Sequence, residues 1–124
     1  MASSSGSLHE SPDRLRPDTI DRHRALVSLM EELEAIDWYD QRVDAAEDTQ
    51  LKALLAHNRD EEKEHAAMAL EWLRRRDPTL DEHLRTYLFT DKPLLKLEND
   101  AERAGEAEED CTGCLGIGSL RAER

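Results

Sequence analysis

Apolar positions recur at helical spacing along two long stretches of the chain. One stripe within residues 18–46 consists of Ala25, Ser28, Leu29, Glu32, Ile36, Tyr39 and Val43. A second stripe within residues 50–76 consists of Leu51, Leu55, Asn58, Glu62, His65, Ala66, Ala69 and Leu73. Because residues three and four apart share one face of an α-helix, each stretch predicts a long helix with one face turned toward a partner.

Helix-starting and helix-ending residues set the limits of these two stretches. Pro17 precedes the first one, and an Asp or Thr is available there as the N-cap. The sequence AEDTQ predicts a break, with Asp48 or Thr49 capping the second helix. Asp77 and Pro78 end the second helix, because a proline cannot continue it. Two long helices joined by so short a turn are expected to lie antiparallel.

Shorter segments flank this helical pair. Residues 1–16 are rich in Ser, Pro and charge, which predicts a disordered arm. A short third helix is expected over residues 80–88, followed by an extended or weakly helical segment, so that residues 17–97 form the helical domain. Residues 98–114 begin with the acidic run ENDAERAGEAEED, which repels itself and predicts a flexible linker.

Residues 115–124 form a distinct C-terminal segment that begins with LGIGSL. This stretch consists of Leu115, Gly116, Ile117, Gly118, Ser119 and Leu120. Such a pattern cannot form a core, but an extended peptide can place its apolar side chains in shallow pockets of another protein. We therefore expect a docking peptide, with an ordinary frayed terminus as the alternative.

The composition favours an all-α fold and an oligomer. The 124 residues suffice for one small domain, and aromatic residues make up only 4% of them. Helix-forming Ala, Leu, Glu, Lys and Arg dominate the middle of the chain. The core of a single chain would be thin, and association of identical chains is the commonest way to cover an exposed apolar face.

The charge of the chain narrows the class of partner. The formal net charge is −12, whereas binding to nucleic-acid phosphates needs a basic face, so the surface is expected to attract cations instead. No apolar run approaches the roughly 20 residues of a membrane span, and the N-terminus lacks the apolar core of a signal peptide. The expectation is a cytoplasmic protein without a nucleic-acid or membrane partner.

Cys111 and Cys114, in the sequence CTGC, are the two cysteines of the chain. They are too few for a disulfide scaffold and have no second pair to complete a zinc site. The simplest interpretation is a pair in a flexible tail, with occasional disulfide formation or metal capture as the alternatives.

Titratable residues interrupt both apolar stripes at positions that could meet. Glu62 and His65 are three residues apart, so a carboxylate and an imidazole project from one turn of helix toward the same spot. This Glu-x-x-His unit forms half of the di-iron carboxylate pattern of four-helix bundles. Glu32 lies on the stripe that packs on the second helix and would face the unit. A partly buried Glu and His bonded within a helix bundle is the alternative interpretation.

The number of ligands predicts a site shared between two chains. One chain supplies one inward Glu and one Glu-x-x-His unit, which is half of the ligand set. A two-fold dimer would bring together four carboxylates and two imidazoles, which suit a pair of iron ions with open positions for oxygen. The predicted fold is therefore an all-α subunit of two long antiparallel helices and a short third one, which supplies half of a four-helix bundle and completes it by dimerisation, as a half-ferritin subunit would.

Further polar residues lie near this stripe or away from it. Glu31 and Glu34 are one turn apart beside Trp38, and a similar cluster on the second helix consists of His57, Glu61 and Glu64. Either cluster could gather cations, and a solvated helix face is the equal alternative. Tyr39 shares the stripe of Glu32, either as a hydrogen-bonding or redox-active neighbour of the site or as ordinary packing.

Three long stretches closely resemble one protein family. They are VSLMEELEAIDWYDQRVDA, AHNRDEEKEHAAMALEWLRRR and LRTYLFT, and the family is that of the encapsulated ferritin-like proteins, the iron-oxidising cargo of encapsulin nanocompartments. The match covers about residues 8–97. It resumes at the C-terminus, where CLGIGSLRAER resembles the targeting sequence by which such cargo is captured on the inner wall of an encapsulin shell.

The resemblance implies specific roles for the polar residues named above. It implies a ferroxidase centre at a dimer interface, within a ring of five dimers, with Glu32, Glu62 and His65 as iron ligands and Tyr39 beside them. It implies a metal-access site at Glu31, Glu34 and Trp38, and an outer site for calcium or other divalent ions at His57, Glu61 and Glu64. The CTGC pair and the acidic linker depart from the family pattern.

Two functions from different classes follow. The first is a ferroxidase that oxidises Fe²⁺ to Fe³⁺ with dioxygen at a di-iron centre between two subunits, for storage inside an encapsulin nanocompartment. The alternative is a non-catalytic helical cargo or adaptor protein whose carboxylates only hold divalent ions.

Overall fold

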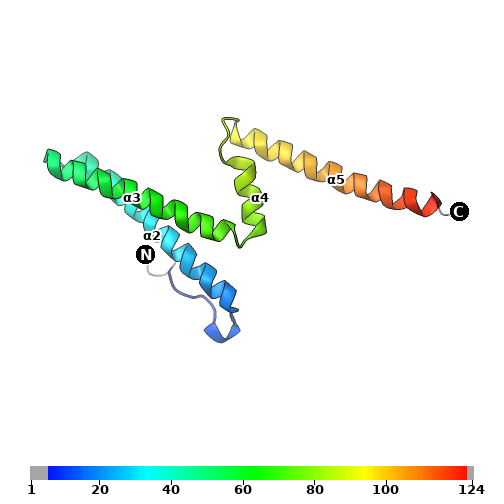
Figure 1. Ribbon diagram of the computed structural model, residues 1–124, viewed down its shortest axis with the longest axis horizontal. Helices are drawn as coiled ribbons and strands as arrows, with labels where there is room; N and C mark the ends of the chain where they lie inside the picture. The colour runs from blue at the N-terminus through cyan, green and yellow to red at the C-terminus, as the bar shows by residue number, and fades with distance from the viewer. Residues whose placement is uncertain (1–5, 123–124) are drawn as a thin grey trace. The chain divides into compact units, whose positions relative to one another are not determined.

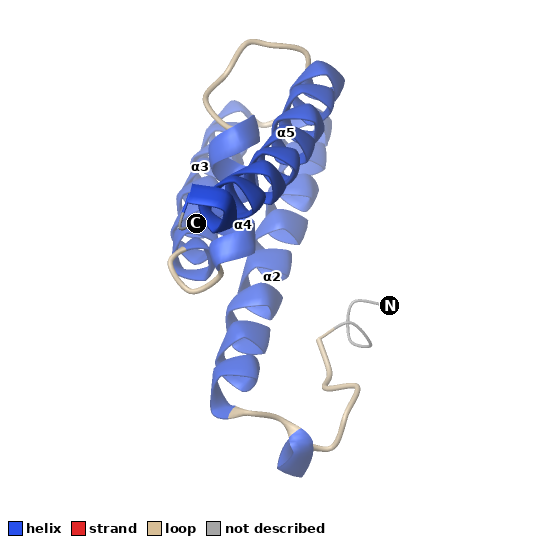
Figure 2. Cartoon of the chain, turned by 90° about the vertical axis from the view of Figure 1, so that its right-hand side faces the viewer, coloured by secondary structure: helices blue, strands red, loops and turns tan. Residues whose placement is uncertain are grey.

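The computed structural model describes residues 6–122, with side chains described for residues 6–110. All regular structure within these residues is helical, and Figure 2 shows no strand among them. The elements are the 3-10 turn η1 (Pro12–Arg14) and the helices α2 (Pro17–Ala45), α3 (Thr49–Arg74), α4 (Pro78–Tyr87) and α5 (Leu94–Ala122). The predicted all-α fold class is confirmed. The chain divides into two compact units, Met1–Leu80 and Asp81–Arg124, which are described separately.

The first unit is built on a hairpin of two long helices. Helices α2 and α3 pack against each other, and Figure 1 shows them side by side. Residues 46–48 join them, so the short turn that AEDTQ predicts is present. The N-cap of α3 is Asp48, whose Oδ1 atom accepts a hydrogen bond of 2.7 Å from the backbone N–H of Leu51. The first of the two predicted caps is thus the one used.

The start of α2 differs from the expectation. Pro17 is the first helical residue and does not merely precede the helix, and the N-cap is Arg16, which makes no side-chain capping hydrogen bond. The prediction of an Asp or Thr cap was therefore wrong at this end. Proline suits the first helical position because that residue needs no N–H donor and its φ angle is already helical. Asp18 still contributes a favourable negative charge to the first turn.

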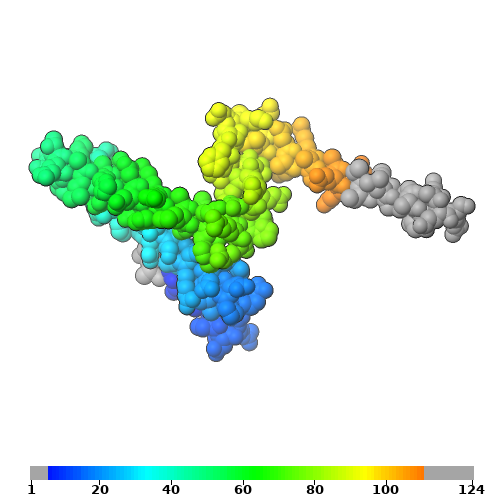
Figure 3. All heavy atoms as spheres, in the orientation of Figure 1, coloured from blue at the N-terminus to red at the C-terminus, as the bar shows by residue number. Residues whose placement is uncertain are grey.

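The interior of the hairpin is thin. Among the described residues, Ala66 and Leu73, both on α3, are the hydrophobic side chains that are buried, at 8% and 3% exposure. Large apolar side chains of both helices stay exposed: Leu26, Met30, Leu33, Trp38, Leu51, Leu54 and Met68. Figure 3 shows the two helices, coloured from blue to green, in space-filling form, with the green atoms of α3 in front of the cyan atoms of α2. Two helices cannot enclose their own apolar faces, as the composition led us to expect.

Helix α4 follows a capped break. The carboxylate of Asp77 accepts a hydrogen bond of 3.0 Å from the backbone N–H of Leu80, so the break expected at Asp77 and Pro78 is present. After α4, Phe89 adopts a left-handed conformation with φ at 58°. That conformation ends a helix, although glycine usually occupies such a position. The ring of Phe89 is fully exposed.

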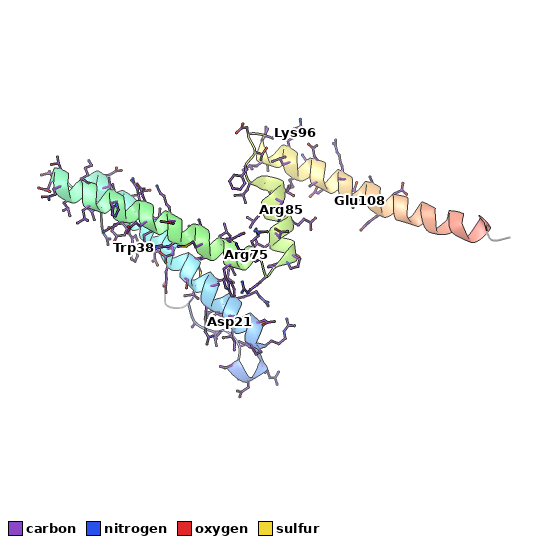
Figure 4. All side chains as sticks on the ribbon, viewed as in Figure 1. Asp21, Trp38, Arg75, Arg85, Lys96 and Glu108 are labelled. Carbon is purple, nitrogen blue, oxygen red and sulfur yellow. The ribbon has the colours of Figure 1, made fainter. Side chains whose placement is uncertain are left out.

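The segment after α4 is more helical than the sequence led us to expect. Helix α5 spans Leu94–Ala122 and so passes through residues 98–114, for which we expected a flexible linker. Ala, Glu and Arg are strong helix formers, and here their propensity outweighs the mutual repulsion of the acidic side chains. Of the described side chains on α5, Leu97 is half-buried and the others are exposed, including the labelled Lys96 and Glu108 in Figure 4.

The N-terminal segment contains a short piece of regular structure. The residues that we expected to be a disordered arm include the turn η1, with Ser11 as its N-cap.

Within residues 6–122, no helix combines the length and the apolar character that crossing a membrane requires.

Candidate metal centre

Three side chains from two helices converge on one point of the hairpin. Glu32 comes from the middle of α2, and Glu62 and His65 come from successive turns of α3. One potential ligand atom from each side chain lies within 4.8 Å of the other two. Among the described residues, this is the one group of three His, Cys, Asp or Glu side chains placed closely enough to hold a metal ion. The structure thus brings Glu32 to the Glu-x-x-His unit, as the two stripes predicted.

The imidazole of His65 connects the two carboxyl groups. Its Nδ1 atom lies 3.2 Å from Oε2 of Glu62 and 3.8 Å from Oε2 of Glu32. The first distance is that of a hydrogen bond and the second that of a looser electrostatic contact. Glu62 and Glu32 are about one quarter exposed, and His65 is about half exposed. An ion could therefore reach the group from the surface of a single hairpin.

The protonation of the two carboxyl groups is linked. A hydrogen bond with Glu62 raises the pKa of Glu32, and partial burial and the charge of Glu62 raise it further. The same hydrogen bond, together with the one from His65, lowers the pKa of Glu62. The two carboxyl groups therefore differ in acidity, and Glu32 is the one that takes up a proton more readily. A bound cation would stabilise both carboxylates in their charged form.

The donor set fits divalent first-row transition metals. Carboxylate oxygens and an imidazole nitrogen bind iron, manganese and zinc, whereas sites for calcium or magnesium consist of oxygen ligands alone. Ligands bonded at about 2 Å to one ion lie up to about 4 Å apart, so the observed spread requires only small side-chain movements. Three protein ligands leave positions open on the ion, which is the arrangement of a reactive site and not of a closed structural one.

Tyr39 and Trp38 follow Glu32 on α2. Tyr39 is half-buried, and the guanidinium carbon of Arg42 lies 5.4 Å from the centre of its ring. Trp38 is 49% exposed and, with Gln41 and Arg42, lines a shallow hollow on the surface. Figure 4 labels Trp38 on this helix. The role of Tyr39 as a neighbour of the ions and that of Trp38 near the access site stay predictions.

The two outer clusters are less closely gathered in one chain than the central group. Glu31 is exposed and Glu34 is half-buried. On α3, Nε2 of His57 lies 3.0 Å from Oε1 of Glu61, and both side chains are more than half exposed. Glu64 lines a shallow groove farther along α3, beside Met68 and Trp72. The access site and the outer site therefore also stay predictions.

The remaining predicted site lies outside the described side chains. Side chains are described up to residue 110, so Cys111 and Cys114 lie outside them. The same holds for the docking residues Leu115, Gly116, Ile117, Gly118, Ser119 and Leu120. One contact between the helices was not predicted from the sequence: Arg59 reaches from α3 to Asp40 on α2. Opposite charges on the facing sides of the two predicted helices are the signal that could have found this contact.

Comparisons with known proteins agree with the architecture. The chain is 58% identical to an encapsulated ferritin-like protein of Rhodospirillum rubrum, over 99% of this chain and 94% of that protein. It is 52% identical to a ferritin-like protein of Thermotoga maritima, over 90% of this chain and 96% of that protein. A crystal structure of a protein from Nitrosomonas europaea has 60% sequence identity and a TM-score of 0.69, and the match covers 71% of this chain and 97% of that one.

A less similar protein and a family model support the same assignment. The chain is 35% identical to an encapsulin nanocompartment cargo protein of Myxococcus xanthus, over 63% of this chain and 60% of that protein. The sequence model of the EncFtn-like family matches residues 7–91, which include both long helices and the whole candidate centre. From the family match and the near full-length likeness to an encapsulated ferritin-like protein, we conclude that the chain belongs to the EncFtn-like family of ferritin-like proteins.

Proposed function

We propose that the protein is a ferroxidase, which oxidises Fe²⁺ to Fe³⁺ at a di-iron centre formed between two subunits. The observation that carries this proposal is the convergence of Glu32, Glu62 and His65 within 4.8 Å. One hairpin supplies half of the ligands of a di-iron carboxylate centre, so a second copy of the chain is needed to complete the centre. Two-fold symmetry supplies that copy, because the same surface then faces itself.

The exposed apolar side chains support association through the hairpin. Leu26, Leu33 and Leu54 are each about half exposed in the single chain. Burying a side chain of this kind contributes roughly 1.5–3 kcal/mol, so a few of them stabilise a dimer against its loss of rotational and translational freedom. The resemblance of the sequence extends the proposed assembly to a ring of five dimers.

Each ligand has a stated task in the proposed reaction. Glu32 and Glu62 hold the cations, whose charge favours the ionised form of both carboxyl groups. His65 contributes a nitrogen ligand once it has lost its own proton. Each Fe²⁺ ion gives up one electron, and dioxygen is the acceptor. The positive charge that iron gains on oxidation is stabilised by the facing carboxylates, which supply the electrostatic part of catalysis.

We further propose that the protein acts as cargo inside an encapsulin nanocompartment, where the oxidised iron is stored. The names of the relatives from Rhodospirillum rubrum and Myxococcus xanthus, an encapsulated ferritin-like protein and an encapsulin nanocompartment cargo protein, support this location. The contact with the shell would be made by residues 115–124.

Aerobic addition of Fe²⁺ to the assembled protein tests the proposed activity. Absorbance of Fe³⁺ is recorded over time against buffer and against an anaerobic sample. Oxidation faster than the buffer blank is expected. A rate equal to that of the blank, in protein that demonstrably binds iron, would instead favour the non-catalytic metal-binding cargo protein.

Two variants assign the activity to the site. His65→Ala and Glu62→Ala each remove two ligands from a symmetric centre, so each is expected to reduce the oxidation rate to that of the blank. His83→Ala is the matched control, because His83 is exposed on α4 and belongs to none of the clusters. Full activity in both site variants would refute the assignment, as would loss of activity in the control.

A further inference from the structure

A network of charged side chains lies beside the candidate centre on the same two helices. Nη1 of Arg59 donates a hydrogen bond of 3.0 Å to Asp40, which lies on α2, while Nε of Arg59 donates one of 3.1 Å to Asp60 on its own helix. The ammonium group of Lys63 donates to the same oxygen of Asp60 at 3.2 Å. Arg59 is 23% exposed, whereas its two carboxylate partners are more than half exposed. The guanidinium is thus held at two points.

The position of Arg59 relates this network to the metal ligands. It precedes Glu62 by three residues, which places the two side chains about one turn apart on α3. On α2, Asp40 lies eight residues after Glu32, about 12 Å of helical rise. The contact therefore joins α3 to α2 about one turn from Glu62 and about two turns from Glu32. The network includes none of the three candidate ligands.

Packing of the hairpin gives weak control over the axial position of its helices. Ala66 and Leu73 are the buried hydrophobic residues among those described, and apolar contact has no preferred direction. The guanidinium of Arg59 is planar and donates hydrogen bonds in fixed directions, so it adds discrimination between axial registers to the weak preference of this thin apolar contact.

The site needs that discrimination. Its ligand atoms lie within 4.8 Å of one another, whereas slippage by one helical turn moves α3 by about 5.4 Å. Even one residue of rise, about 1.5 Å, is most of the length of a metal–ligand bond of about 2 Å.

We propose that Arg59 is a positioning residue of the metal centre, which through Asp40 fixes the register of α3 against α2. The inference rests on the metal centre of the proposed function but not on the oxidation reaction. It concerns residues that touch neither the ions nor the reacting molecules.

Binding of Co²⁺ to the full-length assembly tests the proposal, because the visible absorption of Co²⁺ reports its coordination geometry. Arg59→Gln is expected to weaken Co²⁺ binding by about fivefold, the upper range for a partly exposed ion pair, and to change the absorption spectrum. Asp40→Asn should do the same. The double variant should be no weaker than Arg59→Gln alone, because Arg59→Gln already removes the contact with Asp40.

Arg24→Gln is the matched control. It breaks the ion pair of 2.9 Å between Arg24 and Asp21, which is exposed and lies within α2. This variant should bind Co²⁺ with the affinity and spectrum of the wild type. Far-ultraviolet circular dichroism establishes that each variant remains helical. If Arg59→Gln does not fold, Arg59→Lys carries the test, since it keeps the charge but not the fork; a smaller change in the same direction is expected.

Several results would overturn the proposal. They are a wild-type affinity and spectrum in the folded Arg59 variants, an equal effect in the Arg24 control, and strict additivity in the double variant. Absence of Co²⁺ binding by the wild type would overturn it as well. Failure of the proposed function is distinguishable, because protein that binds Co²⁺ through His65 yet does not accelerate Fe²⁺ oxidation would refute the ferroxidase and leave the role of Arg59 intact.

Discussion

The imidazole Nδ1 atom of His65 lies 3.2 Å from the carboxylate of Glu62, one turn earlier on the same helix. This hydrogen bond raises the pKa of His65, and the charge of Glu32 on the neighbouring helix raises it further. The metal-free site therefore holds a protonated imidazole over a wider pH range than an isolated histidine does. Protons and metal ions compete for the same nitrogen.

Removing the charge of Glu62 should therefore lower the pKa of His65. In metal-free Glu62→Gln, the proton resonances of the His65 ring, followed by NMR as the pH is changed, are expected to titrate at a lower pH than in the wild type. Glu47→Gln is the control, because Glu47 lies in the turn between α2 and α3. An unchanged titration of His65 in Glu62→Gln would contradict the observed pairing.

The same interaction makes the stability of the metal-free protein depend on pH. Because the pKa of His65 is raised on folding, its interaction stabilises the fold fully below the unfolded value of about 6.5 and ceases to do so as the pH rises through the folded value. The expected result is a difference in urea midpoint between the wild type and His65→Ala that is larger at pH 5.5 than at pH 9. An equal difference at both pH values would contradict this.

Metal binding is expected to favour association of the subunits, because ions held between chains stabilise only the associated state. At a free metal concentration of 100 times the Kd, this linkage amounts to about 2.7 kcal/mol. Native mass spectrometry with and without anaerobic Fe²⁺ should show a larger fraction of dimers or higher oligomers with metal. His65→Ala should abolish the response and His83→Ala should retain it. A monomer that carries a complete pair of ions would show that the site is not shared.

Much of the fold could be predicted because it depends on local rules. The stripes of α2 and α3, the Asp48 cap and the break at Asp77 are all encoded within a few residues of where they act. The meeting of Glu32 with Glu62 and His65 then follows from geometry, since a short turn between long helices leaves an antiparallel hairpin. The fold and the core of the candidate site were therefore accessible from sequence.

Other features depend on competition between effects of similar size. At the start of α2, the preference of Pro17 for the first helical position outweighed the side-chain caps that the sequence also offered. In α5, helix propensity outweighed the repulsion of acidic neighbours. The contact of Arg59 with Asp40 spans 19 positions and depends on the axial register of two helices, which stripe patterns leave undefined to within about a turn. The sequence alone does not rank such effects.

The access site is expected to affect the rate of iron uptake and not the centre itself. Changing both Glu31 and Glu34 to Ala removes two negative charges near Trp38 and should slow oxidation at low Fe²⁺ by up to about tenfold, the low end of electrostatic steering. The effect should shrink at high salt, which screens steering. Asp44→Ala with Glu47→Ala is the control of equal charge. Loss of metal from the centre itself, seen in a crystal structure of the Glu31 and Glu34 variant, would count against an access role.

The C-terminal segment is expected to direct packaging without contributing to catalysis. Residues 115–124 follow an acidic stretch and lie outside the predicted helical domain of residues 17–97, so their removal should leave the oxidation rate unchanged and abolish capture by a co-expressed encapsulin shell. Replacing Leu115, Ile117 and Leu120 with Ser should have the same effect, because each buried apolar side chain contributes roughly 1.5–3 kcal/mol of docking energy. Replacing Arg121 and Arg124 with Gln is the control, since it alters the same segment and keeps its apolar residues. Co-purification with the shell is the measurement. If the truncated chain is packaged as well as the intact one, the shell recognises the helical residues and not the C-terminal segment. The exposed apolar side chains of the hairpin would then be the surface that the shell binds.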